Sequence, residues 1–85
     1  MEIEFDPSKD AANIEKHGIS LRRAAELDVR GFTRTERNGE SRLKVIGLLD
    51  GRFYALVLVF RRNAMRAISL RRAHEREVID VQAER

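Results

Sequence analysis

Residues 42–60, RLKVIGLLDGRFYALVLVF, predict two long strands joined by a tight turn. The first strand alternates between two faces, of which one carries Arg42, Lys44 and Ile46 and the other Leu43, Val45 and Gly47. Asp50-Gly51 is a strong two-residue hairpin signal. Residues 53–60 are apolar on both faces, so we expect them to form the central strand of an antiparallel sheet.

Further strands are predicted on both sides of this hairpin. Residues 29–35 contain several residues that favour strands, and the turn sequence RNGE follows at 37–40. Residues 65–70 predict a last strand, after a turn at Asn63-Ala64. Residues 2–5 alternate glutamate with apolar side chains, which predicts a short edge strand.

Two helices are predicted between the first strand and the hairpins. Asp6-Pro7 begins a helix that runs to about residue 16, because aspartate accepts the free amide hydrogens and proline suits the first helical position. Gly18 ends this helix. Ser20 then begins a second, short helix that extends to residue 27. A helix-turn-helix that reads DNA is an alternative, but its second helix would carry only two basic residues.

The last predicted element is a C-terminal helix over residues 72–83. We expect the helices to lie on one side of an antiparallel sheet of about four strands, which defines a two-layer α+β domain. The 85 residues suffice for one domain, spanning 1–85, with a single core.

Composition restricts the kinds of site and the cellular location. The chain has no cysteine, so it forms no disulfide and no thiolate zinc site, and we expect it in the reducing cytoplasm. The longest apolar run, residues 54–60, is far shorter than the roughly 20 residues that span a bilayer. The N-terminus lacks the basic start of an export signal, so neither membrane insertion nor export is expected.

Basic residues gather in the middle of the chain. The net charge of the whole chain is only +3. Residues 29–72 hold eleven basic and three acidic side chains, whereas residues 1–28 hold four basic and seven acidic ones. Arginine dominates, with 14 Arg against 3 Lys, and six arginines with one acid lie within residues 61–76. Arginine can donate two hydrogen bonds at once to a phosphate. The pattern favours a nucleic-acid partner, although arginine could also serve solubility alone.

Several short motifs resemble those of one protein family. Residues 6–24 match its N-terminal signature, in which Asp6-Pro7, Lys9, Asn13, Lys16-His17-Gly18-Ile19-Ser20 and Ala24 stand in order. Glu40-Ser41-Arg42 with Ile46-Gly47, and then residues 65–73 with Glu77, continue the match. Together these blocks are similar to the BrnT family. Leu21, Ala67 and the arginine-rich segment 29–38 depart from the family pattern.

The resemblance implies a toxin of a bacterial type II toxin–antitoxin pair, with a RelE-like α+β fold and a ribonuclease activity that stops translation. It also implies a BrnA-like antitoxin with a ribbon-helix-helix DNA-binding domain. The complex of the two proteins would repress its own operon. The expected partners are therefore RNA, the antitoxin and, through the complex, operator DNA.

RNA can be cut without a metal when its 2′-hydroxyl attacks the adjacent phosphate, which requires a base, an acid and cations. The sequence shows no glycine-rich phosphate loop and no two-metal carboxylate cluster, so we expect no metal and no cofactor. We predict that Arg42, Arg66 and Arg71 bind the scissile phosphate with support from Lys44. Glu40 or His17 would move the proton. Further RNA contacts, or contacts to the antitoxin, are predicted for Arg61, Arg62 and Arg72.

Simpler interpretations remain for these residues. Arg42 and Lys44 also suit an ordinary solvated strand face, and His17 suits a helix end where it hydrogen-bonds terminal carbonyls. Glu40 would then pair with Arg42 or Arg37. Outside the site, we expect His74 on a helix surface, Glu77 in a salt bridge with an arginine of the preceding strand, and Asn13 and Lys16 bracing the helix pair.

Two other functions fit the same charge pattern. A non-catalytic RNA- or DNA-binding module could use a basic sheet through phosphate contacts alone. The arginines could also chiefly receive an acidic antitoxin. Base stacking is not expected, because the five aromatic residues are predicted to lie mostly in the core: Phe5, Phe32, Phe53, Tyr54 and Phe60.

Overall fold

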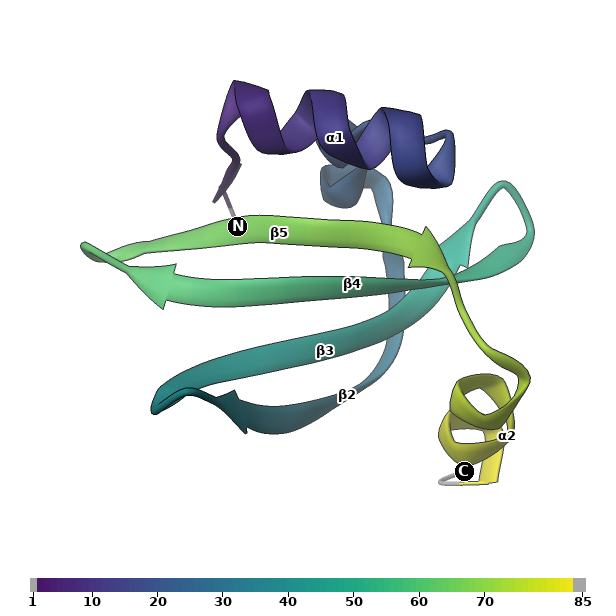
Figure 1. The fold of residues 1–85 in the computed structure, drawn as a ribbon. Helices are drawn as coiled ribbons and strands as arrows, with labels where there is room; N and C mark the ends of the chain where they lie inside the picture. Colours follow the sequence, from purple (N-terminus) through teal and green to yellow (C-terminus); the bar gives the residue numbers. More distant parts are fainter. Residues whose placement is uncertain (1, 84–85) are drawn as a thin grey trace.

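The computed structural model describes residues 2–83, in which a strand and two helices are followed by four strands and a last helix (Figure 1). The elements are β1 Ile3–Glu4, α1 Pro7–His17, the 3-10 helix η1 Leu21–Glu26, β2 Asp28–Arg37, β3 Glu40–Leu49, β4 Arg52–Arg61, β5 Ala64–Arg72 and α2 Glu75–Ala83. The predicted order of elements and the α+β class are confirmed. α2 begins later than predicted, because the chain remains paired with β4 as far as Arg72.

The strands form one sheet in the order β1-β5-β4-β3-β2. β1 is parallel to β5, and the other neighbours are antiparallel. The predicted four-stranded meander is confirmed, with β4 in the centre, and β1 joins its edge to make a sheet of five strands.

Three tight turns connect the strands of the meander. Their central residues, Asn38-Gly39, Asp50-Gly51 and Arg62-Asn63, all have positive φ. Two such residues match the right-handed twist of the flanking strands. The last turn is therefore centred on Arg62-Asn63, one residue earlier than predicted.

The ends of α1 and η1 follow from their capping residues. The Asp6 carboxylate accepts a hydrogen bond from the Ser8 N–H at 2.9 Å, and Gly18 ends α1 with φ 73°. Ser20 caps η1, and the Asp10 carboxylate accepts a hydrogen bond from the Leu21 N–H at 2.7 Å. α1 and η1 are thus joined by short-range polar contacts.

One face of the sheet packs against α1 and η1. Leu21 and Ala24 of η1 are buried there with Val45, Leu56 and other apolar residues of the three inner strands. The buried Asn13 of α1 donates hydrogen bonds to the carbonyls of Ile19 and Leu70 and accepts one from the Leu70 N–H. Asn13 therefore braces α1 against the segment that leads into η1 and also against β5, whereas the sequence predicted a brace between the two helices alone.

α2 lies on the opposite face of the sheet, so the prediction that all helices share one side is wrong (Figure 1). Val81 of α2 is buried with Ile46 and Ala55, which point away from the η1 side. The physical reason is that Val45 and Ile46 are both apolar but project to opposite faces, so each face requires a cover. α2 covers only one end of its face.

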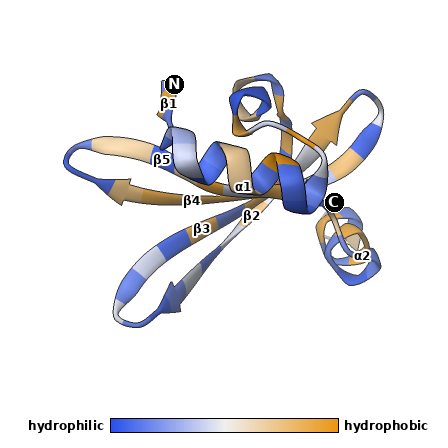
Figure 2. Ribbon diagram, turned by 45° about the horizontal axis from the view of Figure 1, so that its top comes forward, coloured by the Kyte–Doolittle hydropathy of each residue, from blue (hydrophilic) through white to orange (hydrophobic). Residues whose placement is uncertain are grey.

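Two aromatic residues contradict the predicted core. The exposed fractions of Phe32 and Phe60 are 65% and 64%, because α1 and η1 pack mainly along β5. Phe5, Phe53 and Tyr54 are half-buried and pack against the core. Figure 2 shows hydrophobic segments in the middle of the sheet, while the hairpin tips are hydrophilic.

We expect Gly47→Ala to lower the free energy of unfolding by about 2 to 3 kcal/mol, near the upper part of the usual range for overpacking. A Cβ at this position would lie 2.6 Å from the Asp28 carbonyl oxygen and 2.7 Å from Cγ of Leu27. Urea unfolding measures the loss. The exposed Ser41→Ala on the same strand is the control, and an unchanged midpoint for Gly47→Ala would contradict the packing of β2 on β3.

Candidate functional site

The predicted cations meet on the sheet face opposite α1 and η1, in the part that α2 leaves uncovered. Val59 of β4 pairs with Arg42 of β3 on one side and with Arg66 of β5 on the other. The two arginines therefore flank Val59 on one face, with their backbones about 10 Å apart, twice the usual strand spacing. Arginine side chains can converge across such a gap.

Two further rows continue this face toward α2. Lys44, Val57 and Ser69 form the second row, and Ile46, Ala55 and Arg71 form the third. We call the three rows the open face, with four cations: Arg42, Lys44, Arg66 and Arg71.

A β-bulge in β5 places Arg66 and Arg71 on the same face. Val57 pairs with Ser69, but the next residue, Leu58, pairs with Ala67, so one residue of β5 is left unpaired. Strict alternation would send Arg66 and Arg71, five residues apart, to opposite faces. The unpaired residue shifts the alternation by one position, so that Arg66 and Arg71 project to the same face. Bulges often redirect side chains in this way near functional sites.

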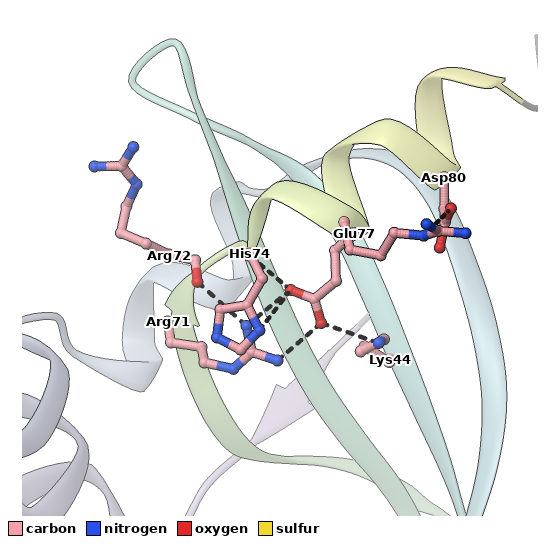
Figure 3. A network of polar contacts seen from close by, with 7 residues as sticks. Lys44, Arg71, Arg72, His74, Glu77 and Asp80 are labelled. Atoms are coloured by element: carbon pink, nitrogen blue, oxygen red, sulfur yellow. Dashed lines mark hydrogen bonds and ion pairs between the residues drawn. The ribbon is translucent and has the colours of Figure 1, made fainter.

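Glu77 of α2 binds two of the four cations (Figure 3). Its carboxylate accepts two hydrogen bonds from the Arg71 guanidinium at 2.8 and 2.9 Å and lies 2.9 Å from Nζ of Lys44. The His74 N–H donates a further hydrogen bond at 2.8 Å, and only 9% of the Glu77 side chain is exposed. The predicted salt bridge between Glu77 and an arginine of the preceding strand is confirmed.

These contacts keep Glu77 ionised. The hydrogen bonds from Arg71, with those from the His74 N–H and Lys44, hold the pKa of Glu77 far below its usual range despite its burial. The pKa of Arg71 is raised in turn by the same carboxylate. The three side chains together carry one net positive charge, and the Nε–H of Arg71 is not used by Glu77.

Arg42 and Arg66 are held less tightly. Arg66 has one contact of 3.5 Å with the largely exposed Glu4. Arg42 forms no ion pair within residues 2–83, and its Nε is buried without a hydrogen-bond partner there. An unsatisfied buried donor costs about 1 to 3 kcal/mol. These two guanidinium groups are therefore the cations of the open face most available to an anion.

Glu40 lies two residues before Arg42 on the same side of β3. Its carboxylate accepts two hydrogen bonds from Arg61, at 2.7 and 2.9 Å, and these lower its pKa. The predicted pairing with Arg42 or Arg37 is wrong. The register places Glu40 between Arg37 of β2 and Arg61 of β4, and Arg61 is the arginine that forms the ion pair.

His17 lies beside the open face rather than on it. It is partly buried at the end of α1, in a groove along β5 that Lys16, Ile68 and Ser69 also line. Burial lowers the pKa of His17, with smaller contributions from the nearby positive charges of Lys16 and Arg71. Both effects favour the neutral imidazole, which is the form that accepts a proton.

The other predicted RNA contacts do not form one surface with Lys44. Arg72 projects away from Arg71, to the opposite face (Figure 3). It lies over the Tyr54 ring, 5.7 Å from its centroid. Arg61 is neutralised by Glu40, and Arg62 is exposed in the turn between β4 and β5.

The sequence-based interpretation missed the joint hold of Glu77 on Lys44 and Arg71. A signal was present, since glutamate three residues after a helix N-cap accepts the backbone N–H of the cap residue, here His74. Within residues 2–83, no group of three His, Cys, Asp or Glu side chains is placed to hold a metal ion. No helix in this range is long and apolar enough to span a membrane.

The fold and the arginines of the open face define a small α+β protein with a sheet surface suited to an anionic polymer. The family model described as "ribonuclease toxin, BrnT, of type II toxin-antitoxin system" matches residues 5–77, and the chain belongs to this family. It is thus a toxin-family protein whose system includes an antitoxin, and the family is a ribonuclease family.

A solved structure agrees with this assignment. The crystal structure of the Brucella abortus ribonuclease toxin BrnT matches with a TM-score of 0.64 and 28% sequence identity, covering 88% of this chain and 99% of that one. No curated protein matches the chain significantly.

Proposed function

We propose that this protein is an endoribonuclease that binds the scissile phosphate of RNA between Arg42 and Arg66. The observation that carries the proposal is their placement on either side of Val59, with few competing contacts. The description of the family as ribonuclease toxins supports the choice of RNA. Guanidinium groups suit this role because their charge is permanent and their donors match phosphate oxygens.

The proposed reaction is attack of a ribose 2′-oxygen on the adjacent phosphorus. The 2′-hydroxyl proton passes to a base as the new bond forms, and the bond from phosphorus to the 5′-oxygen breaks. The leaving 5′-oxygen takes up a proton from a general acid, a role that the protonated base can fill. The products are a 2′,3′-cyclic phosphate and a 5′-hydroxyl, so the step requires neither water nor an oxidant. Arg42 and Arg66 would stabilise the charge that develops on the phosphate oxygens.

Arg71 and Lys44 would support the phosphate from the neighbouring rows. Glu77 holds both side chains in place, and each retains donors that Glu77 does not use. We assign Arg71 and Lys44 to positioning of the substrate. Their attraction for a phosphate is weaker than that of Arg42 and Arg66, because the Glu77 carboxylate pairs with both side chains.

The proton would pass to His17 or to Glu40. The surroundings of His17 favour its neutral form, which can accept a proton, and Glu40 lies on the same side of β3 as Arg42. Their pKa values separate the two roles in the pH dependence of cleavage. A base at His17 gives a rate that falls on the acid side of the ordinary histidine range, whereas a base at Glu40 gives a fall only on the acid side of the ordinary carboxylate range, at much lower pH.

We also propose that the antitoxin resembles BrnA, with a ribbon-helix-helix domain, and that the complex binds operator DNA. The system would act in the cytoplasm, where translated RNA is present. Support comes from the family assignment, since a type II system pairs the toxin with a protein antitoxin.

The test is cleavage of a labelled RNA by the purified chain, with and without EDTA. We expect cleavage in both samples, with cyclic phosphate ends, and no cleavage of the same sequence lacking the 2′-hydroxyl at the cut site. Salt-dependent RNA binding without cleavage would support the non-catalytic binding module instead. Loss of activity in EDTA would contradict the metal-independent reaction.

A further inference from the structure

The second surface of interest is an apolar groove on the face opposite the open face. Buried side chains of β3 and β4, including Val45 and Leu58, form its bottom, and Leu27, Val29 and Phe32 line its sides. Leu43 and Leu58 continue it into a neighbouring hollow, which Phe60 and Arg34 line together with Glu40 and Arg42 at its other end. Val29, Phe32 and Phe60 are all more than half exposed. Exposed apolar side chains gathered in this way mark interaction sites.

The groove borders a free strand edge. β2 is the outer strand of the sheet and pairs only with β3. Every β2 residue except Gly31 is exposed. The bulge between Val29 and Gly31 interrupts regular pairing, so residues 31–37 form the continuous part of the edge. Unpaired backbone groups along such a strand can accept an added strand from another protein.

The groove lies on the other side of the sheet from the proposed RNA site. Phe32 pairs with Val45, and the next residue, Thr33, pairs with Lys44, so the two neighbours project to opposite faces. Phe32 and Arg34 therefore share the groove face. A protein docked in the groove beside Phe32 would not need the contacts of Arg66, although the neighbouring hollow extends to Arg42.

Charge indicates the chemistry of the occupant. β2 carries Arg30, Arg34 and Arg37 against Asp28 and Glu36. Among residues 2–83, Arg34 and Arg37 form no ion pair. If a second copy of this chain docked there, its β2 arginines would face those of the first copy and repel them. An acidic segment would instead neutralise the excess positive charge of β2.

We infer that the groove and the β2 edge anchor the antitoxin through an acidic segment with apolar side chains at alternate positions. The segment adds as a strand beside residues 31–37, its apolar side chains enter the groove beside Phe32, and its carboxylates pair with Arg34. The inference rests on the family assignment, because a type II toxin-antitoxin system includes an antitoxin. It does not depend on the cleavage mechanism.

The experiment uses the full chain and the purified antitoxin encoded beside its gene, with Kd measured by calorimetry. Phe32→Ser and Arg34→Glu should each raise Kd at least tenfold. Ile79→Ser on α2 and Arg52→Glu at the far end of β4 are matched controls at exposed positions and should change Kd less than twofold. All four substitutions are at exposed sites, so thermal unfolding should show folded variants.

Hydrogen exchange of the complex gives an independent measurement. Amides in residues 31–37 should exchange more slowly when the antitoxin is bound. Unchanged Kd in both groove variants would overturn the inference, as would protection confined to the strands around Arg42 and Arg66. A free chain that is dimeric and becomes monomeric with Phe32→Ser would assign the groove to self-association instead.

The result does not depend on RNA cleavage. Phe32 also lines a hollow with Lys44 and Glu77, and Arg34 lines one with Arg42, so the two variants are judged by Kd and hydrogen exchange and not by their cleavage rates. If the wild type cleaves no RNA, the proposed function fails while Kd and exchange still test the docking surface.

Discussion

Arg66→Ala is expected to slow RNA cleavage by about 100- to 1000-fold, the usual loss when one donor that stabilises transition-state charge is removed. Arg42→Ala should have an effect of similar size, because the two residues flank the same residue of β4. Single-turnover cleavage at saturating enzyme measures the chemical step. The effect should appear in this rate more than in RNA binding, since several other cations of the chain contribute to binding.

Two control variants separate charge from geometry. Arg66→Lys keeps the positive charge but loses the planar pair of donors, so its rate should lie between those of the wild type and Arg66→Ala. Arg76→Ala removes an exposed arginine from α2 and should leave the rate unchanged. Wild-type rates in folded Arg42→Ala and Arg66→Ala chains would exclude the open face as the reaction site.

Glu77→Ala is expected to lower the free energy of unfolding by about 2 to 3 kcal/mol. Removing one partner of a buried ion pair costs about 3 to 5 kcal/mol, and the loss here is smaller because Arg71 and Lys44 remain partly exposed to water. The substitution also removes the acceptor for the His74 N–H at the start of α2. Chemical unfolding at pH 7 measures the loss, and Glu75→Ala in the same helical turn is the control.

The same ion pair predicts a pH dependence. The pKa of Glu77 is lower in the folded chain than its ordinary value of 4.5, so its contribution to stability is complete above that pH. It is lost as the pH falls from about 4.5 toward the lower folded pKa. Glu77→Gln should therefore reduce the slope of stability against pH on the acid side. Equal slopes in the two proteins would contradict an ionised, hydrogen-bonded Glu77.

Local features of the fold could be predicted because short-range contacts decide them. Asp6 begins α1 and Gly18 ends it, each through its own backbone and side-chain groups, and Asp50-Gly51 fixes a tight turn. The alternation of Arg42 and Lys44 with apolar neighbours correctly predicted that both lie on one face of β3. The family motifs supported the same order of elements.

Long-range features were predicted less well. Sequence patterns show that Ile46 is apolar but do not show which helix covers it. The prediction that α2 lies on the same side of the sheet as the other helices was therefore wrong. The exposure of Phe32 depends on how far η1 extends across the sheet. The partner of Glu40 depends on the register between two strands, since Arg61 lies 21 residues away in the chain.

The open face shows where the two kinds of information meet. The sequence by itself determined that arginines are concentrated in residues 61–76 and that β5 follows a strong central strand. It did not determine that Arg66 and Arg71 face the same way, because five residues of regular strand would separate them onto opposite sides. Only the pairing of β5 with β4 decided this. A bulge there adds one unpaired residue, which brings both arginines to the open face and leaves Arg72 on the other.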